Sequence, residues 1–304
     1  MINVGILGGA SPNAGELLRI LINHPDVILR QIYEPGLAGR DITSTHHGLI
    51  GECTLKFSDT FNPDKLDIVF VTSRAKEITP ILQNLTDIQG LKIIDLCSEF
   101  YEARKQDPLI VYGVPEVNRK ALVRGATHAV IPPVVETLAC IAMYPLALRS
   151  MLPQTIDIDI EGNTHLDTTR QPVISHISDL FLLAGNASAP QLNLNYKEIE
   201  LGRVVRLSAH IHLPLPIDNI ADIYEEIYDD HNLTHIVGES VNEKEAEGTD
   251  KCIITLDKTS DGKLMIQAIA DAKMRGGAGD AVHVMNLLMG LYEKTGLALK
   301  ASKF

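Results

Sequence analysis

A glycine-rich segment lies near the start of the chain, between a short apolar run and a helical pattern. Residues 5–15 read Gly-Ile-Leu-Gly-Gly-Ala-Ser-Pro-Asn-Ala-Gly, and a helical spacing of leucine and isoleucine begins after Glu16. Glycines at such a turn let the backbone approach a pyrophosphate, which the helix N-terminus stabilises. Similar turns also occur merely to connect a strand to a helix, but the strand, loop, helix and strand context favours a dinucleotide. The candidate cofactor-binding residues of the loop are Gly8, Gly9, Ala10, Ser11, Asn13, Ala14 and Gly15.

An acidic residue follows the next predicted strand. Glu34 lies 19 residues beyond Gly15, where dinucleotide-binding domains place a carboxylate that accepts hydrogen bonds from the adenosine ribose. A carboxylate there repels a 2′-phosphate, so the sequence favours NAD(H) over NADP(H). Two alternatives stay open: Glu34 is a solvated residue in the turn before Pro35, or Arg40 supplies a contact to the phosphate.

The spacing of the cysteines argues against zinc sites and against a disulfide framework. The four cysteines, Cys53, Cys97, Cys140 and Cys252, lie far apart, and no two of them form a CxxC pair. Zinc sites and disulfide frameworks need closely spaced or paired cysteines. We therefore expect reduced thiols and no metal site.

Composition predicts a folded protein of about two domains. Of the 304 residues, 45% are hydrophobic, and Asp and Glu outnumber Lys and Arg by 39 to 27, which gives a net charge of -12. The electrostatic field of a protein with this negative charge repels nucleic acid and anionic lipid surfaces. The chain starts without a basic leader, and no apolar stretch approaches ~18 residues. We therefore expect a cytoplasmic protein that binds neither nucleic acid nor membrane.

The elements that must position the glycine loop alternate between short apolar strands and helical stretches. Strands are predicted at residues 3–7, 27–33, 68–71, 93–96 and 129–131. A helix is predicted at 16–23, ending before Pro25. This alternation predicts an α/β fold with a doubly wound, Rossmann-type parallel sheet. We expect this dinucleotide-binding domain to span residues 1–142 and to be rejoined by a C-terminal helix within 277–304.

The second half has longer alternating segments. Strands are predicted at 155–161, 204–212, 252–256 and 264–268, with a hairpin turn at Asp261 and Gly262. An amphipathic helix is predicted at 219–230, with Ile220 and Tyr224 on its apolar face. These elements predict an α+β substrate and dimerisation domain over residues 143–276, with a mixed or antiparallel sheet.

Four segments carry a more specific signal. They are residues 9–18, 95–100, 112–119 and 276–287. Together they resemble the N-acetyl-gamma-glutamyl-phosphate reductases, a branch of the semialdehyde dehydrogenase superfamily, over nearly the whole chain. The resemblance implies an amino-acid-derived substrate and a homodimer or homotetramer. It also implies a reaction in which a cysteine thiolate attacks an acyl group, and nicotinamide hydride reduces the resulting thioester to a semialdehyde.

The sequence departs from the family pattern at the catalytic cysteine. The family motif Asn-Pro-Gly-Cys-Tyr-Pro-Thr aligns without gaps with residues 131–137, Ile-Pro-Pro-Val-Val-Glu-Thr, which places Val134 at the nucleophile position. Valine has no lone pair, so we expect no covalent acyl intermediate by this route. Cys140 would lie about 9 Å further along a helix and on another side of it, so we expect it in the core.

The resemblance also implies a catalytic histidine before the helix predicted at 219–230. The spacing falls between His210 and His212, with a slight preference for His210, and ordinary structural roles stay open for both. On a strand the two would share a face, but they lack a third ligand, which makes a metal pair the weaker alternative. Glu136 stands where the family has a proline. A buried carboxylate there is a candidate general acid or base, although it also simply favours a helix start.

Other family positions are altered, which predicts a changed cofactor and substrate. Ser73 and Arg74 occupy the turn after the third strand, and Gly277 and Gly279 lie in the C-terminal glycine motif. These four residues are cofactor-binding candidates. The substrate-binding candidates are Asn118, Arg119 and Arg170. The two arginines are suited to binding a carboxylate bidentately, and either can equally form a structural ion pair.

Together these features predict an NAD(P)H-dependent oxidoreductase that reduces an aldehyde, ketone or imine without a thioester. His210 or His212, together with Glu136, would supply the proton. The alternative is a catalytically silent homologue that retains nucleotide binding and acts as a regulatory or partner subunit.

Overall fold

The computed structural model describes residues 1–163, 170–185, 188–213 and 220–301 and divides into two compact units. Unit 1 comprises residues 1–132 and 277–298, and unit 2 comprises residues 133–276 and the end of the chain from residue 299. The division falls earlier than the boundary expected after Ala142. That residue lies inside helix α4 (Val134–Leu148), all of which belongs to unit 2.

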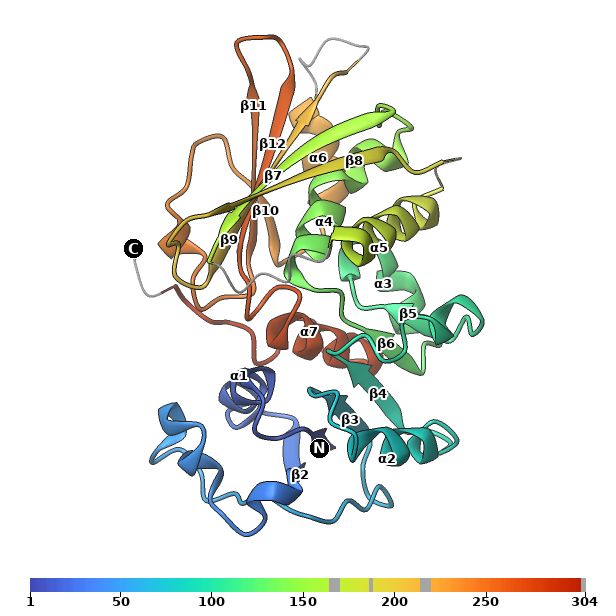
Figure 1. Ribbon diagram of the computed structural model, residues 1–304, viewed down its shortest axis with the longest axis vertical. Coiled ribbons are helices and arrows are strands. Elements are labelled where there is room, and N and C mark those ends of the chain that lie inside the picture. Colours follow the sequence, from blue (N-terminus) through green and yellow to red (C-terminus); the bar gives the residue numbers. More distant parts are fainter. Residues whose placement is uncertain (164–169, 186–187, 214–219, 302–304) are drawn as a thin grey trace. The chain divides into compact units, whose positions relative to one another are not determined.

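Unit 1 is built on a sheet of six parallel strands in the order β2-β1-β3-β4-β6-β5 (Figure 1). The strands are β1 (Ile2–Leu7), β2 (Val27–Tyr33), β3 (Ile68–Val71), β4 (Lys92–Asp95), β5 (Ile110–Tyr112) and β6 (His128–Val130). The predicted parallel sheet is confirmed. Strand β5 was not predicted.

The strands are connected by α1 (Pro12–Leu21), α2 (Ile78–Leu85) and α3 (Pro115–Arg124) and by short 3₁₀ helices at Pro35–Leu37, Ile42–Ser44, His47–Leu49 and Ala103–Lys105. A further helix of unit 1, α7 (Ala278–Leu288), follows the last strand of unit 2 in the chain. Helix α1 begins earlier than expected, because Ser11 caps it by accepting a 3.0 Å hydrogen bond from the Ala14 N–H. Helix α7 packs against α1 and α3.

Unit 2 is built on a mixed sheet of six strands in the order β10-β11-β12-β9-β7-β8. The strands are β7 (Thr155–Gly162), β8 (Gln191–Glu198), β9 (Val204–Ile211), β10 (Thr234–Ile236), β11 (Cys252–Lys258) and β12 (Leu264–Asp271). Strands β7 and β8 are parallel, as are β10 and β11, and the other neighbours are antiparallel. The predicted hairpin joins β11 to β12, with Gly262 at a φ of +81°. Strands β8 and β10 were not predicted.

The two faces of this sheet differ. Helix α4 covers one face, where it packs against β9, β12 and α5 (Arg170–Leu183) (Figure 1). Leu207 and Ala209 of β9 are fully buried, which is expected of residues that face this helix. Because strand residues alternate, Arg206, Ser208 and His210 lie on the opposite face. The helix predicted at 219–230 is α6 (Ile220–Tyr228), and residue 219 lies outside the described residues.

A proline interrupts the hydrogen-bond ladder of α4, and two tyrosines of α6 compensate. Pro145 has no N–H, so the carbonyl of Ile141 lacks its helical donor. The Tyr228 hydroxyl donates to that carbonyl at 2.6 Å, and the Tyr224 hydroxyl donates to the neighbouring Ala142 carbonyl at 2.5 Å. Helix α6 thereby fixes the continuous course of α4.

None of the helices in the described part of the chain has the length and apolar character that a membrane crossing requires.

Candidate functional site

The glycine loop of unit 1 follows β1 and is shaped by close neighbours. Gly8 has a φ of +89°, and a Cβ there would lie 2.4 Å from the Cβ of Ser73. A Cβ at Gly9 would lie 2.4 Å from Cγ2 of Ile32. Both N–H groups donate to the carbonyl of Tyr33, at 3.1 and 3.0 Å. Only glycine fits at either position, and the resulting bare backbone leads directly to the N-terminus of α1.

The N-terminus of α1 can accept a phosphate. Ser11 caps the helix through the Ala14 N–H, and Asn13 lies in its first turn, where N–H groups point out of the helix end. The half-buried carboxylate of Glu34 also lies at this loop, because its Oε2 accepts a 3.0 Å hydrogen bond from the Ala10 N–H. These residues fit a dinucleotide, whose pyrophosphate the helix end would bind and whose ribose Glu34 would bind.

The turn after β3 holds the other two cofactor candidates of this region. Ser73 lies against Gly8, whereas Arg74 is exposed and bound to the next turn of the chain. The Arg74 Nε donates to the carbonyl of Cys97 and lies 3.3 Å from Oε1 of Glu99. Arg74 is therefore held by unit 1 itself.

Asp95 organises that neighbouring turn. Its buried carboxylate accepts hydrogen bonds from the N–H groups of Cys97, at 2.7 Å, and Phe100, at 2.9 Å. Burial raises the pKa of Asp95 to about 6. Burial, together with the charge of Asp95, also raises the pKa of the Cys97 thiol to about 12. Cys97 is therefore a thiol at neutral pH and a poor nucleophile.

The remaining candidates of unit 1 have structural contacts. The Asn118 side chain donates to the carbonyl of Tyr112 at 3.2 Å. A guanidinium nitrogen of Arg119 lies 3.2 Å from Oε2 of Glu293, whose side chain is 2% exposed. Gly277 is the N-cap of α7, and Gly279 lies buried in its first turn. Arg119 thus forms the structural ion pair that the sequence left open.

Val134 is the first residue of α4, directly after the Pro133 N-cap, and it is 7% exposed. Gly276 lies against this helix start with a φ of +64°, and a Cβ there would lie 2.3 Å from the Val134 nitrogen. The backbone at position 134 is therefore held tightly, while its side chain is a hydrocarbon. Cys140 is 1% exposed and lies in the core, as expected.

Glu136 lies in the first turn of α4 and faces a histidine that the sequence analysis missed. Its Oε1 lies 3.3 Å from Nδ1 of His176 on α5, and the side chains are 4% and 12% exposed, respectively. A nearly buried carboxylate beside an imidazole can hold and transfer a proton. No sequence signal pointed to His176, because the two helices are distant in the chain and α5 itself was not predicted.

The structure does not bring His210 to Glu136. The Nε2 of His210 lies 3.1 Å from Oδ2 of Asp159, on the face of the sheet opposite α4. His212 follows the last residue of β9 and is exposed. Arg170 begins α5, and its side chain and residues 166–169 before it lie outside the described part of the chain.

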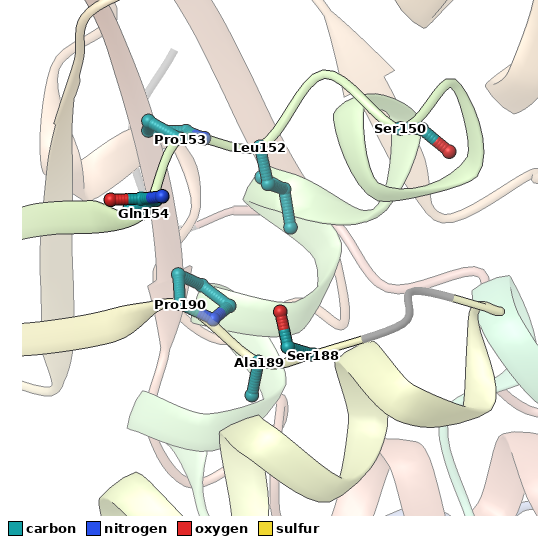
Figure 2. Close-up of a pocket in the computed structure, with 7 residues that line it drawn as sticks. All are labelled: Ser150, Leu152, Pro153, Gln154, Ser188, Ala189 and Pro190. Carbon is teal, nitrogen blue, oxygen red and sulfur yellow. The ribbon is translucent and has the colours of Figure 1, made fainter.

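A hollow of about 410 Å³ lies elsewhere in unit 2, between the connection from α4 to β7 and the segment before β8 (Figure 2). Its polar groups are the hydroxyls of Ser150 and Ser188 and the amide of Gln154. The described residues that line it include no ionisable side chain, so they offer no acid or base for catalysis.

Solved structures share this two-unit architecture. The aspartate semialdehyde dehydrogenase of Candida albicans, solved with NADP, matches with a TM-score of 0.74 at 10% identity, covering 95% of this chain and 98% of that chain. Aspartate semialdehyde dehydrogenase II of Vibrio cholerae matches with a TM-score of 0.73 at 14% identity, covering 96% and 99%. The family described as semialdehyde dehydrogenase, NAD binding domain, matches residues 3–124. The fold is thus that of the semialdehyde dehydrogenases, with a nicotinamide-cofactor domain at the start of the chain.

Curated relatives identify the branch. The N-acetyl-gamma-glutamyl-phosphate reductase of Parabacteroides distasonis is 35% identical, and that of Bacteroides thetaiotaomicron 31% identical, each over the full length of both chains. The chain belongs to the N-acetyl-gamma-glutamyl-phosphate reductase family, whose members are NAD(P)-dependent oxidoreductases. The family assignment and the fold class predicted from the sequence are confirmed.

Proposed function

We propose that this protein uses NAD(P)H to reduce an aldehyde, ketone or imine carbon of an amino-acid-derived substrate, without forming a thioester. The observation that carries the proposal is Val134 at the tightly held start of α4. Its side chain has no lone pair to attack an acyl phosphate. A substrate that is already at the carbonyl or imine level needs only a hydride and a proton.

No other thiol is suited to replace the missing nucleophile. Cys140 and Cys252 of unit 2 are 1% and 0% exposed. In unit 1, the raised pKa keeps Cys97 protonated, and Cys53 lies in the loop between β2 and β3, outside the family motifs. This distribution supports chemistry without a covalent acyl intermediate.

The proton is assigned to Glu136, with His176 as its positioning partner. When bound, a nicotinamide cofactor would supply the hydride for the substrate carbon, and the electron pair of the C=O or C=N π bond would move onto oxygen or nitrogen. Glu136 then delivers a proton to that atom and takes another from solvent through His176. The 3.3 Å separation and the low exposure of both side chains support this role. His212 stays a second candidate donor, whereas His210 is bound to Asp159.

The cofactor preference follows from Glu34. Its hydrogen bond to the Ala10 N–H holds the carboxylate at the glycine loop, which favours the unphosphorylated ribose of NAD(H). Arg40 is exposed on the same segment and is the residue that would favour NADP(H) instead. We also propose a homodimer or homotetramer, located in the cytoplasm.

The test is oxidation of NADH, followed by absorbance, with a panel of amino-acid semialdehydes, cyclic imines and 2-oxo acids. Turnover with one of these classes is expected, as is tighter binding of NADH than of NADPH in a fluorescence titration. Binding of NADH without oxidation by any substrate would favour the catalytically silent homologue. Tighter binding of NADPH would overturn the cofactor preference.

A Val134→Cys variant separates these possibilities further. If the backbone at the helix start is intact and only the nucleophile is missing, the variant gains reduction of an N-acetylated acyl phosphate, while the wild-type protein has none. Trapping of an acyl-enzyme by mass spectrometry in the wild-type protein would contradict the proposal.

A further inference from the structure

A histidine that the sequence analysis did not single out lies against the glycine loop of unit 1. His46 follows the 3₁₀ helix Ile42–Ser44, and its half-buried ring lies near Phe57, with ring centroids 6.4 Å apart. Its Nε2 lies 2.7 Å from the carbonyl oxygen of Gly9. Because a carbonyl can only accept, Nε2 carries a hydrogen and donates it.

The same peptide group is held from its other side. The Gly9 carbonyl and the Ala10 N–H belong to one peptide unit, and that N–H donates to Oε2 of Glu34 at 3.0 Å. A peptide unit is planar, so rotating it away from one partner also rotates it away from the other. Two side chains from the segment after β2 therefore fix a single peptide plane of the loop.

Gly15 adapts α1 to this arrangement. A Cβ at residue 15 would lie 2.7 Å from Nδ1 and 3.0 Å from Cε1 of His46. The last glycine of the loop thus makes room for the imidazole. The ring of His46 is consequently fixed both by a hydrogen bond and by the shape of the helix start.

We propose that His46 is a positioning residue for the dinucleotide. By holding the Gly9–Ala10 peptide, it keeps the Ala10 N–H directed at Glu34, and this contact aims the carboxylate at the adenosine ribose. The inference rests on the proposed preference for NAD(H) and extends it to a second residue. Without His46, Glu34 loses its fixed partner, so binding of NADH weakens more than binding of NADPH, whose 2′-phosphate the carboxylate repels.

The experiment is a fluorescence titration of the full-length protein with NADH and with NADPH. His46→Phe should raise the Kd for NADH about tenfold, the size expected for one lost hydrogen bond to a held group, and change the Kd for NADPH by no more than about twofold. His46→Gln, whose amide can still donate to the Gly9 carbonyl, should restore most of the affinity. The matched control is His47→Phe, because the adjacent His47 is exposed and its Nδ1 lies 3.0 Å from the nearby Thr43 carbonyl rather than at the glycine loop.

An equal loss of NADH and NADPH binding in His46→Phe would indicate a merely structural role and overturn the inference, as would no loss at all. A second variant covers a poorly folding His46→Phe. His46→Ala removes the ring without adding bulk, so its Ala10 amide resonance should shift from the wild-type position, whereas the resonance in His46→Gln and in His47→Phe should stay close to it. An unmoved Ala10 resonance in His46→Ala overturns the inference. A wild-type preference for NADPH would instead overturn the proposed cofactor, on which the inference rests. Failure of the inference about His46 can therefore be distinguished from failure of the proposed preference for NAD(H).

Discussion

The glycine loop of unit 1 and the start of α4 in unit 2 are both turns from a strand into a helix, and both fall within motifs of the family. They differ in the side chains that the turn presents. In unit 1, the glycines make room for the side chains of Ser73, Ile32 and His46. The carboxylate of Glu34 is held at the loop by the Ala10 N–H. In unit 2, Gly276 makes room for the backbone of Val134, but the side chain there is a hydrocarbon.

This difference shows that the backbone geometry of such a turn does not determine the chemistry of the side chain that it holds. The close approach of Gly276 to Val134 is a backbone feature, which does not depend on the side chain at position 134. The same backbone would therefore support a cysteine in the Val134→Cys variant. Glu136 lies at the same helix start and pairs with His176 of α5, which gives this region an ionisable pair.

The largest expected effect comes from Gly276→Ala, which removes the backbone support of α4. The added Cβ would meet the Val134 nitrogen at 2.3 Å in a left-handed conformation, and neither backbone can yield easily. We expect a loss of about 4 kcal/mol in the free energy of unfolding, the sum of conformational strain and overpacking. Urea unfolding monitored by circular dichroism measures it.

The control for this substitution is Gly262→Ala in the hairpin between β11 and β12. Gly262 has a similar φ, +81°, but a Cβ there meets nothing within 4 Å. Its loss should be only about 1 kcal/mol, from backbone strain alone. Equal losses in the two variants would show that the approach of Gly276 to α4 does not matter.

In unit 1, Asp95→Asn tests how the turn beside the loop depends on pH. The raised pKa of Asp95, about 6 against ~3.9 in the unfolded chain, means that the folded state binds the proton more tightly. The stabilisation is fully present below pH ~4 and is lost as the pH rises through about 6, an order-of-magnitude change of about 3 kcal/mol. The variant cannot titrate, so the difference in unfolding free energy between wild type and variant should change across this window. A difference that is constant from pH 4 to 7 would contradict the buried, ionisable Asp95.

Sequence reasoning found features that are local and missed those that are not. The glycine loop, the hairpin at Gly262 and the apolar face of α6 are defined within a few residues, so their patterns were readable. The pairing of Glu136 with His176 joins two helices, and the contact of His46 with Gly9 spans 37 positions. Neither leaves a periodic signal. The assignment of His210 as a partner of Glu136 depended on spacing alone, and the alternation of β9 places it on the other face of the sheet.

The smallest expected effect concerns the two tyrosines of α6 that donate hydrogen bonds to adjacent carbonyls of α4. One of these carbonyls has no helical N–H donor, whereas the other has one. The Ile141 carbonyl has lost its helical donor to Pro145, so Tyr228→Phe leaves it buried without a partner. We expect a loss of about 2 kcal/mol. The Ala142 carbonyl also faces the N–H of Leu146 in the helical pattern, so Tyr224→Phe should cost only about 1 kcal/mol. Both changes keep the aromatic ring, which makes each variant the control of the other in urea unfolding. Equal losses would mean that the missing N–H of Pro145 does not set the requirement for Tyr228.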